Sequence, residues 1–327
     1  MGTKERNMIG PPHEVSEVAI ERLIAALDSL IDGDRAAEQL ILLGQRVILP
    51  VERFLLTSRP KSVSVSRCRA VRILGALGAY SSLIRYLRES ARPSDATVLL
   101  AEDAVRSAAG RELIGHESSA TFRILRDAVK QRPTSGLVQA LSAYQWPESV
   151  PLLFDLLEDD LCREDAKEGL RKVPDGARAY AILLLRGLTE LSICGSNASR
   201  RRRATLQLLV ELGIGVNEWP DLREFLEDED RDCVISAATL GLRCAPAAER
   251  PPIVAALIEA SAEMNWAQET EAVELLDKWP LLARQVAREI HVRRADCGER
   301  PNWSSPFWRI LHHILGGEMQ EQKPGAA

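Results

Sequence analysis

The sequence predicts an all-helical (all-α) protein in which about eight antiparallel helix pairs stack into a solenoid. Composition is the first observation behind this prediction. Leucine and alanine are abundant, while aromatic residues make up only 5% of the chain. Such interiors suit helix-on-helix packing, whereas sheets favour β-branched and aromatic residues. The other two observations are a phrase that recurs along the chain and a set of Trp-Pro dipeptides that keep its register.

The recurring phrase is clearest in residues 35–58 and 67–90. Each copy has a short helix with small residues, then a Leu-Gly dipeptide, then a Leu-rich second helix. The dipeptides are Leu43-Gly44 and Leu74-Gly75. Small residues let paired helices approach closely, and we expect the glycine to end the first helix. Further copies are predicted near 98–131, 135–159, 161–190, 198–227, 230–260 and 266–292.

Several helix ends are predicted from local signals. An amphipathic helix is expected over about 15–32, ended by Gly33 in the left-handed conformation, with Asp34 as the next N-cap. The Leu212-Gly213 and Leu240-Gly241 dipeptides are expected to end later first helices, and Val234 and Ala237 to face inward.

Trp-Pro occurs at Trp146-Pro147, Trp219-Pro220 and Trp279-Pro280. Each dipeptide is expected to open a second helix, because proline is favoured at the first helical position. An apolar residue before the cap can pack on the first turn, so these tryptophans are interpreted as structural rather than as ligand platforms.

The predicted organisation has four parts. Residues 1–13 read as a disordered leader and residues 14–296 as the repeat solenoid. Residues 297–316 read as a C-terminal capping segment with a helix near 307–315, because the last repeat of a solenoid otherwise exposes an apolar face. Residues 317–327 are expected to be a disordered tail.

Charge and cysteine usage exclude several classes of function. The formal net charge of −5 gives no overall attraction to nucleic acid or to anionic membranes. Six scattered cysteines form no CxxC pair, and no apolar signal segment precedes them, so we expect reduced thiols in a cytoplasmic protein. The apolar stretches are too short to span a bilayer, so no membrane association is expected.

The helix, Leu-Gly, helix phrase resembles bacterial HEAT-repeat proteins, including the type first met in phycobilin lyases, over about residues 35–290. The resemblance implies a right-handed α-α superhelix whose second helices line the concave side. Members of this family serve as scaffolds, cargo-binding proteins and a few enzymes. It therefore implies a fold more specifically than a function.

The family's di-iron hydroxylases bind metal through several His-Glu pairs. This chain has His13-Glu14 in the leader and His116-Glu117 between helices, so only one pair lies in the repeats. His312 and His313 are adjacent, and adjacent helical residues point about 100° apart, so they do not chelate together. We therefore expect no metal site and no cofactor.

Other enzymatic alternatives find little support in the residues. There is no GxSxG motif, no Gly-rich phosphate loop, and no Cys–His pair or reactive cysteine that would support a bilin lyase. A relative of the HEAT-like alkylpurine DNA glycosylases is an alternative because of the tryptophans and arginines. The acidic net charge and the missing family motif weigh against it.

Charged residues recur in register on the predicted second helices. Residues 84–89 (IRYLRE) and 122–127 (FRILRD) repeat one six-residue phrase, and VERFLL precedes them by one repeat. The corresponding places hold acidic residues in the fourth and sixth repeats. The candidate residues are Arg53, Arg85, Arg88, Arg123, Arg126, Asp155, Glu158, Glu224 and Glu227.

An inner face that changes from basic to acidic favours a protein partner with complementary patches. The simpler interpretation is a solvated polar face with no partner. A second basic cluster, Arg200, Arg201, Arg202 and Arg203, follows Ser199 near a predicted helix start, where cations are disfavoured, and this hints at an acidic partner.

The sequence therefore predicts a non-catalytic adaptor or scaffold that binds a protein partner on its concave face. The alternative is a nucleic-acid-binding protein, with or without base-excision chemistry, in which the five arginines of the second helices contact phosphates.

Overall fold

The computed structural model describes residues 16–57, 63–90, 93–190 and 196–316, and every regular element among them is helical. The chain divides into two compact units, residues 1–145 and 146–327. The whole predicted leader (1–13) and the whole predicted tail (317–327) lie outside the described residues. None of the described helices is long and apolar enough to cross a membrane.

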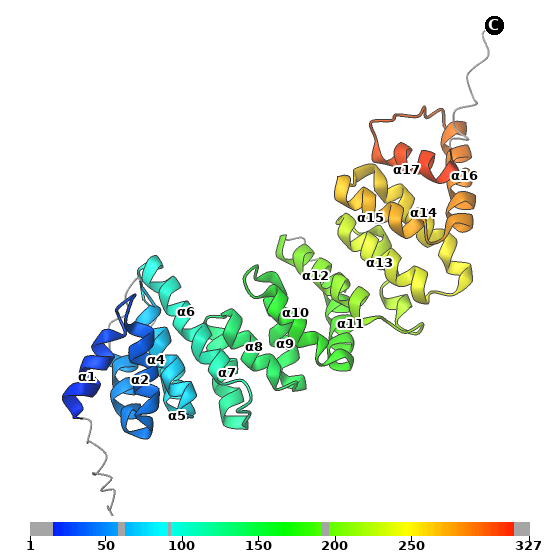
Figure 1. Ribbon diagram of the computed structural model, residues 1–327. Coiled ribbons are helices and arrows are strands. Elements are labelled where there is room, and N and C mark those ends of the chain that lie inside the picture. The colour runs from blue at the N-terminus through cyan, green and yellow to red at the C-terminus, as the bar shows by residue number, and fades with distance from the viewer. Residues whose placement is uncertain (1–15, 58–62, 91–92, 191–195, 317–327) are drawn as a thin grey trace, which may run out of the picture. The chain divides into compact units, whose positions relative to one another are not determined.

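The first unit consists of two layers of helices (Figure 1). Helices α2, α4, α6 and α8 pack side by side in one layer, and α3, α5 and α7 form the other. Leu40, Leu55, Leu74 and Leu83 are fully buried in this unit. The elements are α1 (Glu17–Ala26), α2 (Gly33–Leu42), the 3-10 helix η1 (Gly44–Val47), α3 (Ile48–Thr57), α4 (Val65–Ala76), α5 (Tyr80–Glu89), α6 (Ala96–Glu112), α7 (Ser119–Gln131) and α8 (Ser135–Ala143).

In the second unit, the short 3-10 helices η4 and η5 take the place of an α-helix after α12, and 3-10 segments also flank the short helix α9. Its first part contains η2 (Pro147–Ser149), α9 (Val150–Asp155), η3 (Leu156–Glu158), α10 (Arg163–Arg171), α11 (Pro174–Glu190), α12 (Ser196–Leu212), η4 (Trp219–Asp221) and η5 (Arg223–Glu227). Its second part contains α13 (Arg231–Cys244), η6 (Ala247–Glu249), α14 (Arg250–Ala260), η7 (Ser261–Glu263), α15 (Trp266–Leu276), α16 (Pro280–Asp296) and α17 (Pro306–Leu315).

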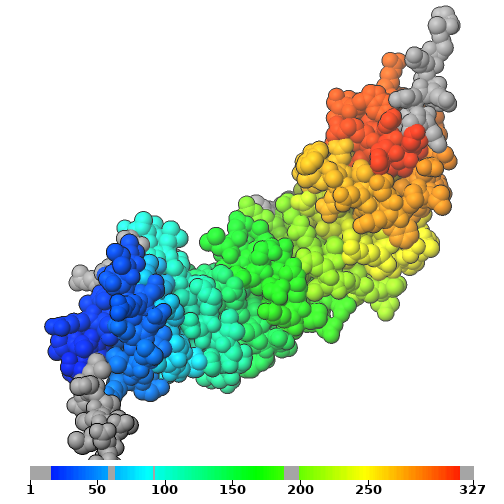
Figure 2. Space-filling model, in the orientation of Figure 1, coloured from blue at the N-terminus to red at the C-terminus, as the bar shows by residue number. Residues whose placement is uncertain are grey.

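Packing within each unit is mostly between elements that are close in sequence. Figure 2 shows this as a gradual change of colour along the surface of each unit. In the second unit α12 packs on α13, α13 on α14, and α14 on α16. Helix α17 covers α14, α15 and α16 with its buried Phe307, Trp308 and Leu311. The last helix therefore covers apolar surface of α14, α15 and α16.

The glycines that end first helices are only partly those predicted. Gly44 (φ 67°) and Gly213 (φ 75°) are left-handed and follow α2 and α12, as expected. Gly75 and Gly241 instead lie inside α4 and α13 and are buried, so the prediction that they end helices is wrong. Gly78 (φ 68°) follows α4 instead. The sequence contains two Leu-Gly dipeptides there, and the second is the one at the turn.

The first helix is shorter than predicted. Helix α1 ends at Ala26, and Leu30 is 81% exposed rather than part of an apolar face. Nη1 of the buried Arg69 donates hydrogen bonds to the backbone carbonyls of Leu27 and Ser29, at 2.8 and 2.7 Å. Carbonyls at a helix end need such donors, so a long-range contact stabilises this end.

Gly33 is not a left-handed stop but the first residue of α2, and Asp32 is the N-cap residue in place of Asp34. A Cβ atom at Gly33 would collide with the guanidinium of Arg69, so close packing, rather than a turn, accounts for this glycine.

Two of the three Trp-Pro dipeptides open helical segments as predicted. Pro147 begins η2, which leads into α9, and Pro280 begins α16. Trp219 differs, because it is itself the first residue of the 3-10 helix η4. Its side chain is buried and its Nε1 donates to Glu249 at 2.8 Å, which gives it a structural role.

Candidate functional site

The five predicted arginines of the first unit lie on three adjacent helices of one layer. We call this surface the arginine face: Arg53 on α3, Arg85 and Arg88 on α5, and Arg123 and Arg126 on α7. Helix α5 packs between α3 and α7. All are exposed except Arg126, which is partly exposed, with 37% of its side chain accessible.

Only some of these arginines form ion pairs with described residues of the unit. Arg85 donates to Glu52 on α3 at 3.2 Å and to Glu89 one turn later at 3.0 Å. These hydrogen bonds, with Glu89 first, raise the pKa of the Arg85 guanidinium above its usual range. Arg126 contacts its neighbour Asp127 at 3.4 Å. Arg53 and Arg88 form no ion pair with any residue that the structure describes.

Carboxylates and apolar side chains lie between the arginines. Glu89 and Asp127 are exposed on the same helices. Leu49 on α3 is 71% exposed, and Ile84 and Ile124 are partly accessible beside Arg85 and Arg123. The arginine face is therefore a mixed surface rather than a uniformly basic one.

Three of the four arginines of the second basic cluster pair with carboxylates of the same unit. Helix α12 begins at Ser196, so Arg200 to Arg203 lie about a turn inside the helix instead of at its start. The unfavourable field of a helix N-terminus falls off within the first turn, so the expected cost to these cations is small. Arg201 pairs with Glu158 and lies 3.5 Å from Asp155. Two of the predicted acidic binding residues thus have an intramolecular partner.

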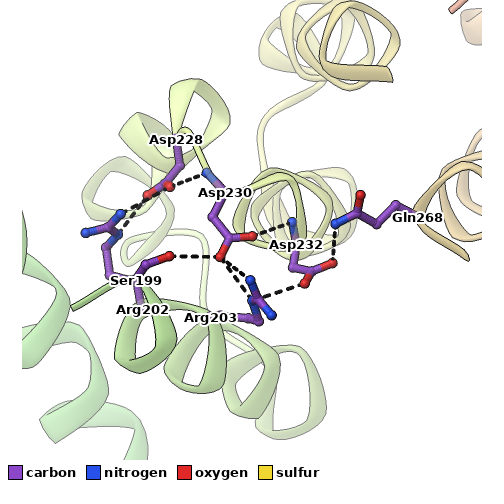
Figure 3. Close-up of polar contacts among 7 residues, drawn as sticks. All are labelled: Ser199, Arg202, Arg203, Asp228, Asp230, Asp232 and Gln268. Carbon is purple, nitrogen blue, oxygen red and sulfur yellow. Dashed lines mark hydrogen bonds and ion pairs between the residues drawn. The ribbon is translucent and has the colours of Figure 1, made fainter. Parts of the chain in front are cut away.

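Arg202 and Arg203 neutralise the acidic turn before α13 (Figure 3). Arg202 Nε lies 2.9 Å from Asp228. Arg203 Nη2 lies 2.6 Å from Asp230, and its Nε lies 3.0 Å from Asp232. The acidic partner that the arginine run suggested is therefore present in this chain. Arg200 is exposed and makes no ion pair with the described residues.

Asp230 is the central residue of this cluster. Its Oδ2 accepts from Ser199 Oγ at 2.9 Å, and its Oδ1 caps α13 by accepting the Asp232 N–H at 3.0 Å. Burial on its own raises the pKa of this carboxyl, but the hydrogen bonds from Arg203, Ser199 and Asp232 outweigh it and lower the pKa below its usual value. The cluster is a structural joint between α12 and α13.

Glu224 and Glu227 lie in a different setting, at a groove of about 840 Å³ in the second unit. The walls come from α11, from η4 and η5, and from the start of α14. Lining residues include Arg186, Asp221, Glu224, Glu227, Pro252 and Ala256. We call this the Glu224 groove.

Charges in the Glu224 groove are partly paired. Arg186 donates to Asp221 across the groove wall, and this hydrogen bond raises the pKa of the guanidinium. Glu224 and Glu227 are exposed and form no ion pair with the described residues. Arg223 also lines the groove. A second hollow of about 390 Å³ adjoins it between α14 and α16 and shares Pro252.

Two of the described histidines are engaged in separate contacts. His116 stacks on Tyr80 with ring centroids 3.5 Å apart, and His313 Nε2 lies 3.0 Å from Asp277. His13 is outside the described residues. Among the residues that the structure describes, no group of three or more His, Cys, Asp or Glu side chains is placed to hold a metal ion.

Sequence reasoning identified Glu224 and Glu227 but missed the groove they border. Pro252 and Ala256 come from the next helix along the chain, and Arg186 from an earlier one. The Pro251-Pro252 dipeptide was the local signal that marked this helix start. None of the protein-family models, curated proteins and solved structures compared with the chain matches it.

Proposed function

We propose that the protein is a non-catalytic adaptor of HEAT-like solenoid type that binds a protein partner through its arginine face. The observation that carries this proposal is the mixture of side chains on that face. Exposed Arg53 and Arg88 offer charges without a partner among the described residues, while Leu49, Ile84 and Ile124 offer apolar contact between them. Protein interfaces combine apolar anchors with arginine in this way.

The same mixture disfavours the nucleic-acid alternative. Glu52, Glu89 and Asp127 stand among the arginines, and Arg85 is engaged by two of them. Carboxylates close to a phosphate backbone repel it, and affinity for DNA comes mainly from unopposed cations. A partner with separate acidic and apolar groups fits better than a uniformly charged polymer.

The test compares two charge reversals in the same unit. Arg85→Glu with Arg123→Glu alters the arginine face, whereas Arg35→Glu with Arg111→Glu makes the same charge change on exposed residues of the other layer, on α2 and α6. The probes are a labelled peptide in which glutamate alternates with leucine, and a labelled DNA duplex of similar length.

We expect the acidic peptide to bind the unaltered protein and the α2/α6 control, and to lose at least about tenfold in affinity for the arginine-face variant. Equal loss in both variants, or no binding to the unaltered protein, would overturn the proposal. DNA binding that falls steeply with salt, and less steeply for the arginine-face variant, would establish the alternative in its place.

A further inference from the structure

The Glu224 groove carries a second inference, independent of the arginine face because the two surfaces share no residue. We propose that it binds a segment of a protein partner that carries arginine or lysine next to apolar side chains. The cationic groups pair with Glu224 and Glu227, and the apolar groups lie against Pro252 and Ala256.

Acidic residues that lie close together in the chain have different surroundings in the fold. Asp228, Asp230 and Asp232 turn toward α12 and are paired by Arg202 and Arg203 (Figure 3). Glu224 and Glu227 lie only a few residues earlier, are exposed, and border the groove instead. A carboxylate pair at an open hollow supplies the acceptors that a guanidinium or ammonium group requires.

Among the described lining residues of the groove, acidic side chains outnumber basic ones by one. Arg186 pairs with Asp221, which leaves Arg223, Glu224 and Glu227 as the other charged residues of that described lining. A ligand with a surplus of positive charge complements it.

The start of α14 forms part of the floor of the groove. Helix N-termini usually attract anions through free N–H groups. Here Pro251 and Pro252 occupy the first turn of α14 and have no N–H to donate. This helix start is therefore poorly suited to an anion, and it presents the rigid apolar ring of Pro252 to the groove.

The adjoining hollow extends the apolar floor. Its lining includes Pro252, Ala255, Val286 and Ile290, so apolar side chains continue from α14 to α16, and the exposed Glu289 lines it as well. Arg293 at its edge is already paired with Glu259. Two connected hollows suit an extended segment with more than one anchoring side chain.

The experiment measures binding of a short labelled peptide in which arginine alternates with leucine. The reference is the same peptide with glutamate in place of arginine. The groove variant is Glu224→Lys with Glu227→Lys. The matched control is Glu229→Lys with Glu274→Lys, which makes the same charge change at exposed residues of the same unit that do not line the groove.

We expect the basic peptide to bind the full-length protein and to lose at least about tenfold in affinity for the groove variant only. Ala256→Gln, which fills the floor without changing charge, should also weaken binding. The inference is overturned if both charge variants lose equally, if Ala256→Gln binds normally, or if the glutamate peptide binds as well as the basic one.

Failure here is distinguishable from failure of the proposed function. The variant Arg85→Glu with Arg123→Glu should bind the basic peptide unchanged, and the groove variant should bind the acidic peptide unchanged. Circular dichroism of each variant confirms that it is folded before affinities are compared.

Discussion

The indole of Trp219 occupies the space beside Gly241, so that a Cβ atom at Gly241 would overlap the ring. Gly241 lies inside α13 and Trp219 begins η4, two elements that pack on each other. The absence of a side chain at Gly241 thus makes room for the large indole of Trp219. A helix-interior glycine normally weakens a helix, but at this position tertiary packing requires it.

Gly241→Ala should therefore destabilise the second unit by about 1–3 kcal/mol, because the added methyl group forces the indole to move. Gly187 on α11 is the matched control, since a Cβ there meets no other atom within 4 Å. Gly187→Ala should be neutral or stabilise by up to about 1 kcal/mol. Urea unfolding followed by tryptophan fluorescence compares the two, and equal effects would contradict this account.

Tryptophan fluorescence also separates the two units. All six tryptophans occur in residues 146–308, and none lies in residues 1–145. Fluorescence therefore reports on the second unit, while far-UV circular dichroism reports on both. Each stability prediction can be assigned to one unit by comparing these two signals.

The buried pair between Arg67 and Glu102 should be essential to the first unit. Both side chains are at most 8% exposed, and Tyr86 donates its hydroxyl to the same carboxylate. Glu102→Ala leaves a buried guanidinium without its partner, which costs about 3–5 kcal/mol. The circular dichroism transition of the first unit should move to lower urea while the fluorescence transition stays in place.

The double variant Arg67→Met with Glu102→Leu serves as the control for that prediction. It removes both charges, so it should recover part of the loss. A double variant that is less stable than Glu102→Ala would show that the pair contributes through packing rather than through charge.

Gly78→Ala should destabilise the first unit by about 1 kcal/mol, because its φ of 68° disfavours a side chain. Gly78→Asn should cost less, since asparagine tolerates the left-handed region better than alanine does. Circular dichroism in urea measures both. If Ala and Asn behave alike, backbone conformation is not what requires glycine at this turn.

Acid should weaken the joint between α12 and α13. The pKa of Asp230 is lowered in the folded protein from its ordinary value near 3.8. The ionised carboxylate therefore stabilises the fold fully at pH values above that ordinary pKa. That contribution is lost as the pH falls from about 4 through the lowered pKa. Near neutral pH, Asp230→Asn should lower the stability of the second unit by about 1–2 kcal/mol.

Asparagine still caps α13, so this variant isolates the charge. The difference between Asp230→Asn and the unaltered protein should shrink as the pH falls below 4, measured by fluorescence during thermal unfolding. A difference that stays constant across that range would contradict the assigned role of the carboxylate.

The sequence alone determined that the chain is helical and where most helix pairs fall, because apolar spacing and left-handed glycines such as Gly44 and Gly213 are local signals. It also placed four of the five arginines of α3, α5 and α7 on exposed positions, since their spacing follows one helix face. Tertiary structure decided the rest.

Gly75 and Gly241 look like helix stops in the sequence, but each lies inside a helix against a side chain from another element. Likewise, Arg202 and Arg203 belong to a basic cluster for which the sequence hinted at an acidic partner, and their carboxylates lie more than twenty residues later in the same chain. Which charges are neutralised and which border a groove depends on contacts between residues distant in sequence. Local sequence patterns do not indicate those contacts, because only the packed fold brings the distant residues together.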